Sequence, residues 1–261
     1  MVLAIDIGNT NTNVGLFSDG GELAFLSEIK TDKYKTQDQC CIDLLDVFRL
    51  YKADVEQVSG VIISSVVPPI TANMSAAALR LTGQKPLVVG PGLKTGMNIK
   101  ADVHNQLGSD IVASSVAAFS KYETPVIVIN LGTAITFSYL SDNAYEGCAI
   151  TPGFRLALEA LSERAAQLPH ISIEGEVRAL GRNTVDAMRA GVMLGNAGAI
   201  DRMIDSMEEA AGLPARTIVA TGDSSQQILR YCKHHVREDP NLLMDGLFLL
   251  YQKNTASGRK K

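Results

Sequence analysis

The sequence predicts an α/β fold of two similar lobes, and three observations support this. The chain has 261 residues, 46% of them hydrophobic, which is enough for one large core or two modest ones. A short motif near the N-terminus returns almost half a chain later. Both copies are followed by the same order of elements, extended runs and then a helix. This repetition predicts two lobes built on one plan.

The repeated motif reads as a strand, a tight turn and a second strand. A constant offset of 124 residues aligns its copies: Asp6 with Asn130, Gly8 with Gly132 and Thr12 with Thr136. Each turn combines glycine with small hydroxyl and amide side chains. Glycine lets the backbone approach an anion, and N–H, Thr and Asn groups supply neutral donors, so the motif predicts phosphate binding. A single copy is equally typical of a polar hairpin loop, but two copies in register favour phosphate.

In the first half, apolar β-branched runs predict strands and 3.6-residue spacing predicts helices. The expected strands cover residues 2–7, 12–17, 22–29, 58–66 and 86–89. The expected helices cover residues 36–51, 70–81 and 109–122. The last of these is rich in alanine and leads into the second lobe.

The second half repeats this order before it ends in helices. Strands are expected at 126–129, 134–140, 144–150 and 217–220, and helices at 154–167, 184–211, 225–232 and 241–253. Glycines within 184–211 mark places where backbones pack closely or the helix breaks. We therefore expect an N-terminal lobe at 1–118, a C-terminal lobe at 119–253 and a disordered tail at 254–261, a frayed end rather than a basic binding tail.

Composition excludes several functional classes. A formal net charge of −4 and a pI near 5.6 offer no electrostatic basis for binding nucleic acid or an anionic membrane surface, so small molecules or proteins are the expected partners. The N-terminus lacks a basic segment and the apolar runs are too short to span a bilayer, which favours a cytoplasmic protein. The four cysteines lack CxxC spacing, and buried thiols are favoured over metal ligands or disulfides.

Three residues stand out as candidates for chemistry. Asp6 follows a strand beside the first turn, where its carboxylate can hold a hydrated Mg²⁺ against phosphates. Asp110 follows Gly108 at the start of a predicted helix, so it is either a first-turn acid of that helix or a base that accepts a proton from an attacking hydroxyl. Thr184 lies at the start of a long predicted helix, where both it and Asn183 are typical of an N-cap, although a cap and a ligand contact can coexist.

Motifs along nearly the whole chain carry a resemblance to one family. They are Asp6-Ile-Gly-Asn-Thr10, Gly108-Ser-Asp110, Gly132-Thr-Ala-Ile-Thr136, Ile150-Thr-Pro-Gly153, Leu168-Pro169, Gly181-Arg-Asn-Thr184 and Thr221-Gly222. Their order and spacing resemble the type III pantothenate kinases of the actin, sugar kinase and Hsp70 ATPase superfamily. The resemblance implies two lobes of ribonuclease H-like (actin-like ATPase) topology with a nucleotide cleft between them. It also implies transfer of the γ-phosphoryl group of ATP to pantothenate, the first step of coenzyme A synthesis, by a homodimer that needs K⁺ or NH₄⁺.

The resemblance also implies roles for individual residues. Asp110 is the expected catalytic base, and Thr184 is expected to bind pantothenate across the dimer interface. Substrate contacts are expected at Gly108, Ser109, Asp110, Ile111 and Thr184. ATP contacts are expected at Asp6, Gly8, Asn9, Thr10, Asn11, Thr12, Asn13, Gly132 and Thr133, with Thr221 and Gly222 near the adenosine. Asp6 is expected to hold Mg²⁺ through water, and Asn130 occupies the position of the family's monovalent cation ligand.

Several positions depart from the family pattern. Ile111 stands where the pattern has arginine, Asn130 where it has aspartate, Cys148 and Asp223 where it has glycine, and Ala101 where it has tyrosine. Asn130 keeps a carbonyl oxygen but lacks the charge that hard cations prefer, and Ile111 lacks a permanent cation and its donors. A lost charge-assisted contact costs on the order of 1.5 to 3 kcal/mol, so weakened activity is expected.

Three functions remain open at this point. The first is a pantothenate kinase with an altered cation site. The second is a non-catalytic or regulatory homologue, of the type described as accessory transcription factors. The third is a kinase of the same superfamily for another small hydroxylated substrate. Small residues within 184–211 favour a homodimer through close helix packing, while a helix buried within its own chain explains the same pattern.

Overall fold

The computed structural model describes residues 1–100, 107–142, 144–222 and 225–255. The departures at Ala101 and Asp223, and most of the expected tail, lie outside these residues. The chain divides into a first unit of residues 1–120 and 241–261 and a second unit of residues 121–240.

The first unit is a mixed sheet with helices on both faces. Its elements are β1 (Val2–Ile7), β2 (Asn11–Phe17), β3 (Leu23–Lys30), α1 (Gln37–Leu50), a 3₁₀ turn (Val55–Gln57), β4 (Gly60–Ser65), α2 (Pro68–Thr82), β5 (Leu87–Val88), β6 (Asn98–Ile99), α3 (Ser109–Lys121) and α7 (Leu242–Thr255). The sheet order is β3-β2-β1-β4-β5. The first three strands are antiparallel neighbours, whereas β4 pairs in parallel with β1. A parallel pair needs a crossover connection, and α1 supplies it.

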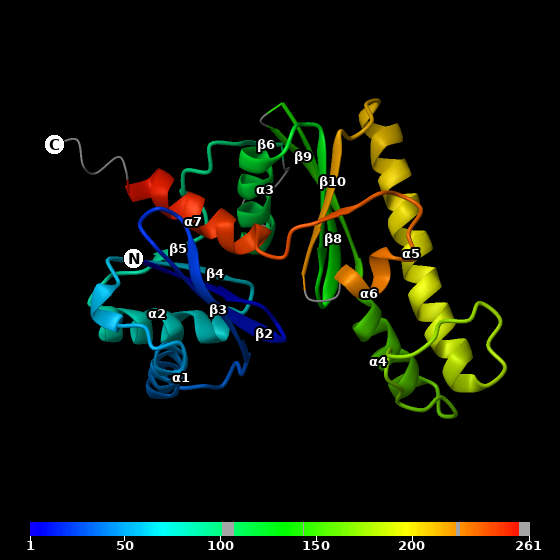
Figure 1. Cartoon of the computed structure of the whole chain (residues 1–261), viewed down its shortest axis with the longest axis horizontal. Coiled ribbons are helices and arrows are strands. Elements are labelled where there is room, and N and C mark those ends of the chain that lie inside the picture. The colour runs from blue at the N-terminus through cyan, green and yellow to red at the C-terminus, as the bar shows by residue number, and fades with distance from the viewer. Residues whose placement is uncertain (101–106, 143, 223–224, 256–261) are drawn as a thin grey trace. The chain divides into compact units, whose positions relative to one another are not determined.

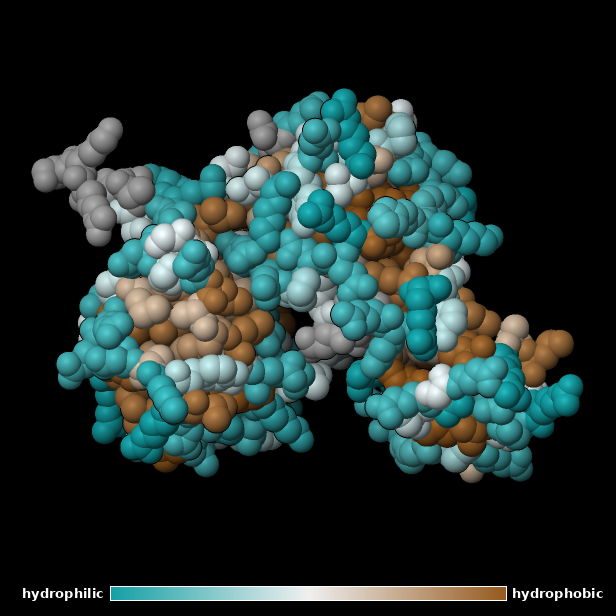
Figure 2. All heavy atoms as spheres, viewed as in Figure 1, coloured by the Kyte–Doolittle hydropathy of each residue, from teal (hydrophilic) through white to brown (hydrophobic). Residues whose placement is uncertain are grey.

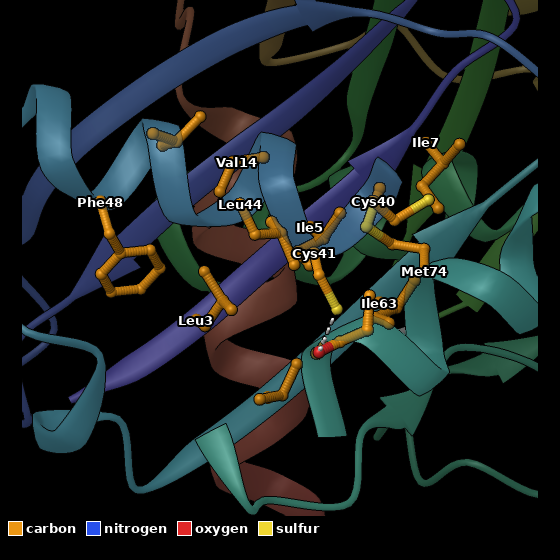
Figure 3. Close-up of a cluster of buried hydrophobic side chains, with 14 of the residues drawn as sticks. Leu3, Ile5, Ile7, Val14, Cys40, Cys41, Leu44, Phe48, Ile63 and Met74 are labelled. Carbon is orange, nitrogen blue, oxygen red and sulfur yellow. Dashed lines mark hydrogen bonds between the residues drawn. The ribbon is translucent and has the colours of Figure 1, made fainter. Parts of the chain in front are cut away.

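The alternation of side chains along β1 separates two cores. Leu3, Ile5 and Ile7 point toward α1 and α2, where they pack against Leu44 and Met74 (Figure 3). Residues of the other parity, such as Val2 and Ala4, pack with α3 and α7 instead. Figure 1 shows α1 and α2 together on one side of this sheet and α7 with α3 on the other. Both faces of β1 are therefore covered, which explains why every residue from Val2 to Ile5 is apolar.

The second unit repeats this architecture. Its elements are β7 (Val126–Leu131), β8 (Ala134–Ser141), β9 (Ala144–Pro152), α4 (Phe154–Arg164), α5 (Thr184–Ala211), β10 (Thr217–Thr221), α6 (Ser225–Leu229) and β11 (Arg237–Glu238). The order β9-β8-β7-β10-β11 matches the order β3-β2-β1-β4-β5 strand for strand. A core of β7, β8, α4 and α5 side chains covers one face. The prediction of two similar lobes is confirmed.

The last helix differs from its expected place. The sequence assigned residues 241–253 to the C-terminal lobe, but α7 packs in the first unit against α3. The approach is so close that a Cβ on Gly246 would collide with the backbone of Ala113. Apolar periodicity indicates that a helix has a buried face, but not which sheet buries it. Elsewhere the helices end earlier than expected, at Arg164 and Leu229, while α5 is continuous through its glycines.

The strand register corrects one part of the repeat alignment. Asp6 pairs with Asn13, whereas Asn130 pairs with Thr136, because the second turn is one residue shorter. Asn13, and not Thr12, is therefore the structural equivalent of Thr136. Thr12 shares its face with the buried strand residues beside α1 and α2, is 1% exposed, and its hydroxyl bonds to that of Thr31 at 2.8 Å.

The surface of the protein carries both polar and apolar residues. Hydrophilic residues spread widely over the visible face, with smaller hydrophobic patches between them (Figure 2). No helix among the described residues is long and apolar enough to cross a membrane.

Cys40 and Cys41 are buried in the core beside α2, as expected, and the Cys41 thiol lies 3.8 Å from the carbonyl oxygen of Ala77 (Figure 3). The expectation of a buried thiol is wrong for Cys148, which is exposed on β9.

Candidate functional site

The first candidate phosphate turn joins β1 to β2. Its backbone closes through a hydrogen bond from Gly8 N–H to the Asn11 carbonyl oxygen at 3.0 Å. A Cβ on Gly8 would lie only 3.0 Å from that same oxygen, so glycine permits the tight closure. Asn9 and Thr10, at the tip, are exposed. The turn thus presents backbone and amide donors outward, as an anion-binding turn requires.

Asp6 lies at the base of this turn, at the carboxyl end of β1. It is 7% exposed and sits between Asn13 of β2 and Ser64 of β4 in the sheet register. Among the described residues no group of three or more His, Cys, Asp or Glu side chains could form a metal cage. One carboxylate flanked by neutral oxygens fits Mg²⁺, which keeps most of its waters and takes one or two protein carboxylates.

A serine network brings helix α3 to the same edge of the sheet. The Ser109 hydroxyl accepts hydrogen bonds from the Ser64 hydroxyl and the Ser65 N–H, both at 3.0 Å, and donates to the Ser65 carbonyl at 3.1 Å. Since Ser64 pairs with Asp6, the N-terminus of α3 and its Asp110 lie at the carboxyl ends of β1 and β4. The two carboxylates predicted from sequence are therefore gathered at one end of the first unit.

The Asp110 carboxyl lies in surroundings that favour its protonated form. Burial raises its pKa above the ordinary value of 3.8, and hydrogen bonds from the backbone N–H groups of Ile111 and of Asp110 itself oppose that rise. The Gly108 carbonyl accepts the first hydrogen bond of α3, from Val112 at 3.1 Å. A Cβ on Gly108 would collide with Oδ1 of Asp110, so glycine gives the carboxylate its room. A place in the first turn of α3 is therefore compatible with a role for Asp110 as a base.

Ile111 contributes no charge to this corner. Its side chain is 7% exposed and lies in the buried part of α3. The permanent cation that the family pattern places here is thus replaced by an apolar side chain. The Asp110 carboxylate consequently depends on burial and backbone N–H groups for its pKa.

The second candidate phosphate turn joins β7 to β8. The Gly132 N–H bonds to the Ala134 carbonyl at 3.2 Å, and the Thr133 carbonyl accepts from Gly153 N–H at 2.9 Å. A Cβ on Gly153 would collide with the carbonyl oxygens of Gly132 and Thr133. The Pro-Gly turn before α4 therefore packs against this loop and holds it in place, while Gly132 and Thr133 remain exposed.

Asn130 occupies the position in β7 that Asp6 occupies in β1. It is half-buried and lies between Thr136 of β8 and Thr221 of β10 in the register. Gly222, at φ +102°, turns the chain directly above β7, where a Cβ would meet the backbone of Leu131 at 2.6 Å. An amide oxygen and two neighbouring threonines are gathered here. They are neutral oxygen donors, which suit a monovalent cation less well than a carboxylate would.

Thr184 begins helix α5, but it is not the cap. Asn183 is the N-cap, and its Oδ1 accepts from the Asp186 N–H at 2.9 Å. Thr184 is exposed and lines an open groove of about 700 Å³ between α4 and α5. Its hydroxyl is thus not committed to capping the helix, which leaves it available to a ligand.

Comparison with known proteins decides the family. The sequence profile of the type III pantothenate kinases matches residues 2–206. The chain is 38% identical to the type III pantothenate kinase of Listeria monocytogenes over 261 residues, which is 100% of both chains. It is 40% identical to that of Brevibacillus brevis over 257 residues, 97% of this chain and 99% of the relative.

This chain belongs to the type III pantothenate kinase family. Its fold is that of the actin-like ATPase and sugar kinase superfamily. A Campylobacter jejuni protein described as of the Baf family of transcriptional activators aligns with TM-score 0.61 and 19% identity over 97% of this chain and 99% of its own. The ROK hexokinase of Thermus thermophilus aligns with TM-score 0.53 and 13% identity over 97% and 99% of the two chains. At these identities the structures show a shared fold alone.

Sequence reasoning missed part of this family's site as it is built here. Ser64 and Ser65 dock α3, yet neither residue was singled out. Gly153, whose N–H bonds to the second turn, was noted only as part of a family motif. A usable signal was present, because Ser64-Ser65 ends a buried strand directly before Pro68-Pro69. Polar residues at the carboxyl ends of parallel strands are frequently site residues in α/β folds.

Proposed function

We propose that this chain is an active pantothenate kinase of the cytoplasm, which transfers the γ-phosphoryl group of ATP to the primary hydroxyl of pantothenate. The products are ADP and 4'-phosphopantothenate. The observation that carries this proposal is the placement of Asp110 beside Asp6 at one sheet edge, next to an open phosphate-type turn. Full-length similarity to pantothenate kinases supports pantothenate as the acceptor.

In this mechanism Asp110 orients the pantothenate hydroxyl and accepts its proton as the oxygen attacks the γ-phosphorus. A carboxyl whose pKa is raised by burial is a stronger base than an ordinary aspartate, and it must be ionised to act. The turn at Gly8–Asn11 supplies N–H and side-chain donors to phosphate oxygens, and the turn at Gly132–Thr133 offers donors of the same kind. Phosphoryl transfer needs little more from the protein than such positioning and charge neutralisation.

Two cations belong to this proposal. Mg²⁺, held through water by Asp6, would neutralise charge on the phosphates. Asn130 offers a neutral oxygen where the family pattern has a carboxylate, so this position attracts K⁺ or NH₄⁺ less strongly and a weak dependence on monovalent cations is expected. Weak cation use, together with the apolar Ile111, implies modest turnover.

We also propose that the chain acts as a homodimer through α5. One side of this helix is buried in the second unit's core, as the intramolecular alternative requires. Gly191, Gly195 and Gly198 lie on another side at helical spacing. A Cβ built on any of them meets no described atom within 4 Å outside its chain neighbours and the adjacent backbone of the helix itself. This open strip beside the Thr184 groove supports close approach of a second α5. Light scattering at micromolar protein tests it, and a monomer would contradict it.

The regulatory alternative and the alternative acceptor are separated from this proposal by one assay. ADP release is followed with Mg·ATP and pantothenate, and with a panel of polyols and amino alcohols, with and without K⁺. We expect turnover with pantothenate alone, and no turnover in Asp110→Asn. Turnover only with another alcohol would establish the other kinase. Absence of turnover with every acceptor, in a protein that Mg·ATP still stabilises against heat, would favour the regulatory homologue.

A further inference from the structure

The end of β3 is fixed against the first phosphate turn by three contacts. Lys30 lies directly opposite Asn11 in the β2–β3 register. The Thr31 N–H donates to the Thr10 carbonyl at 2.9 Å, and the Thr31 hydroxyl bonds to that of Thr12 at 2.8 Å. Residues directly opposite in an antiparallel pair have Cβ atoms about 5 Å apart and share a face. The Lys30 side chain therefore projects on the same side as the Asn11 side chain of the turn.

The segment that follows forms one wall of a pocket. Lys30, Asp32, Lys33 and Val67 line an open cavity of about 520 Å³ together with Asn9, which belongs to the turn. The Asp32 carboxylate accepts a hydrogen bond from the Tyr34 N–H at 2.9 Å, which bends the chain after β3. The pocket therefore adjoins the phosphate turn, because Asn9 belongs to both.

The charges in this pocket are unbalanced. Neither Lys30 nor Lys33 has a carboxylate within ion-pair distance among the described residues, and the Lys33 ammonium lies 5.1 Å from the centre of the Tyr34 ring. By contrast, the nearby Lys35 is paired with Asp43 at 2.6 Å. Two ammonium groups against one carboxylate leave a net positive pocket in a chain whose formal net charge is −4. Such a pocket attracts a multiply charged anion.

We propose that Lys30 and Lys33 bind the terminal phosphates of the nucleotide, as positioning and charge-neutralising residues for phosphoryl transfer. This inference rests on the proposed kinase function, since the turn beside the pocket holds the nucleotide there. The turn itself supplies neutral donors, and Ile111 supplies no cation at the α3 corner. The ammonium groups provide positive charge, which stabilises the negative charge on a phosphoryl group during its transfer.

Calorimetric titration of the full chain with Mg·ATP, Mg·ADP and AMP tests this inference. In Lys30→Gln and Lys33→Gln we expect the Kd for Mg·ATP to rise about tenfold each, which is the lower end for a lost charge-assisted hydrogen bond. The change should be smaller for Mg·ADP and absent for AMP. It should shrink between 0.05 and 0.5 M NaCl, roughly as screening increases, and Lys30→Arg should keep most of the affinity. Lys85→Gln, an exposed lysine outside the pocket, is the matched control.

Each result separates this inference from the function beneath it. Wild-type protein that binds Mg·ATP, with a double Lys30→Gln, Lys33→Gln variant of equal affinity, overturns the inference and leaves the kinase proposal intact. An equal loss for ATP, ADP and AMP also overturns it, because that pattern indicates a structural role. A folded wild-type protein that binds no nucleotide overturns the kinase proposal, and this inference with it.

Discussion

The substitution Gly108→Ala tests whether the room beside Asp110 matters for catalysis. The added methyl group would collide with the Asp110 Oδ1 atom, and the obstacle is the end of a side chain rather than backbone. The carboxylate must therefore move, by about 1 Å, to restore a normal separation of about 3.5 Å between heavy atoms. A displacement of about 1 Å in a reacting group lowers turnover by about a hundredfold.

The same substitution should leave the fold almost unchanged. Alanine is a poorer N-cap than glycine for α3, by up to about 1 kcal/mol. It also restricts the unfolded chain, which stabilises the protein by about 0.4 to 1 kcal/mol, so the two effects nearly cancel. We therefore expect kcat to fall about a hundredfold while the melting temperature and the Kd for Mg·ATP stay near those of the wild type.

The measurement is steady-state ADP release with pantothenate, beside thermal unfolding and nucleotide titration of the same samples. Gly90→Ala is the matched control, since a Cβ there meets no described atom within 4 Å. A kcat for Gly108→Ala within about threefold of wild type would contradict this prediction, because the carboxylate would then have moved without consequence.

Three further predictions concern charge. Asp110→Asn should abolish turnover and raise the melting temperature at pH 7 but not below pH 3.8. The pKa of Asp110 is higher in the folded protein than in the unfolded chain, so ionisation of this carboxyl lowers folding stability as pH rises above 3.8, and asparagine removes that loss. An unchanged melting temperature at pH 7 would contradict the burial of this charge. Asn130→Asp should create or strengthen activation by K⁺, and strong K⁺ activation of the unmodified enzyme would show that another group holds the cation. A disulfide reagent at pH 8 should modify Cys148 rapidly and Cys232 slowly, because burial raises the pKa of Cys232 to about 11; Cys148→Ala should remove the fast phase.

Local sequence determined the elements on which the site is built. Alternation and turn residues placed both hairpins, and the bounds of α5 were predicted correctly at Thr184 and Ala211. The position of Asp110 in the first turn of a helix was also evident, because Gly108 precedes an alanine-rich periodic run. These features depend on residues a few positions apart, so the sequence itself carries them.

Tertiary packing decided the rest. The sheet that receives α7 depends on the fit of Gly246 against Ala113, and the equivalence of Thr136 with Asn13 depends on a turn shorter by one residue. Likewise, Ser64 at the end of β4 contacts Ser109 of α3, which lies 45 positions further along the chain. No local pattern encodes such contacts, because they follow from which surfaces are complementary once the strands have paired. The chain therefore specifies its two candidate phosphate turns locally, whereas the surroundings of Asp110 exist only in the folded protein.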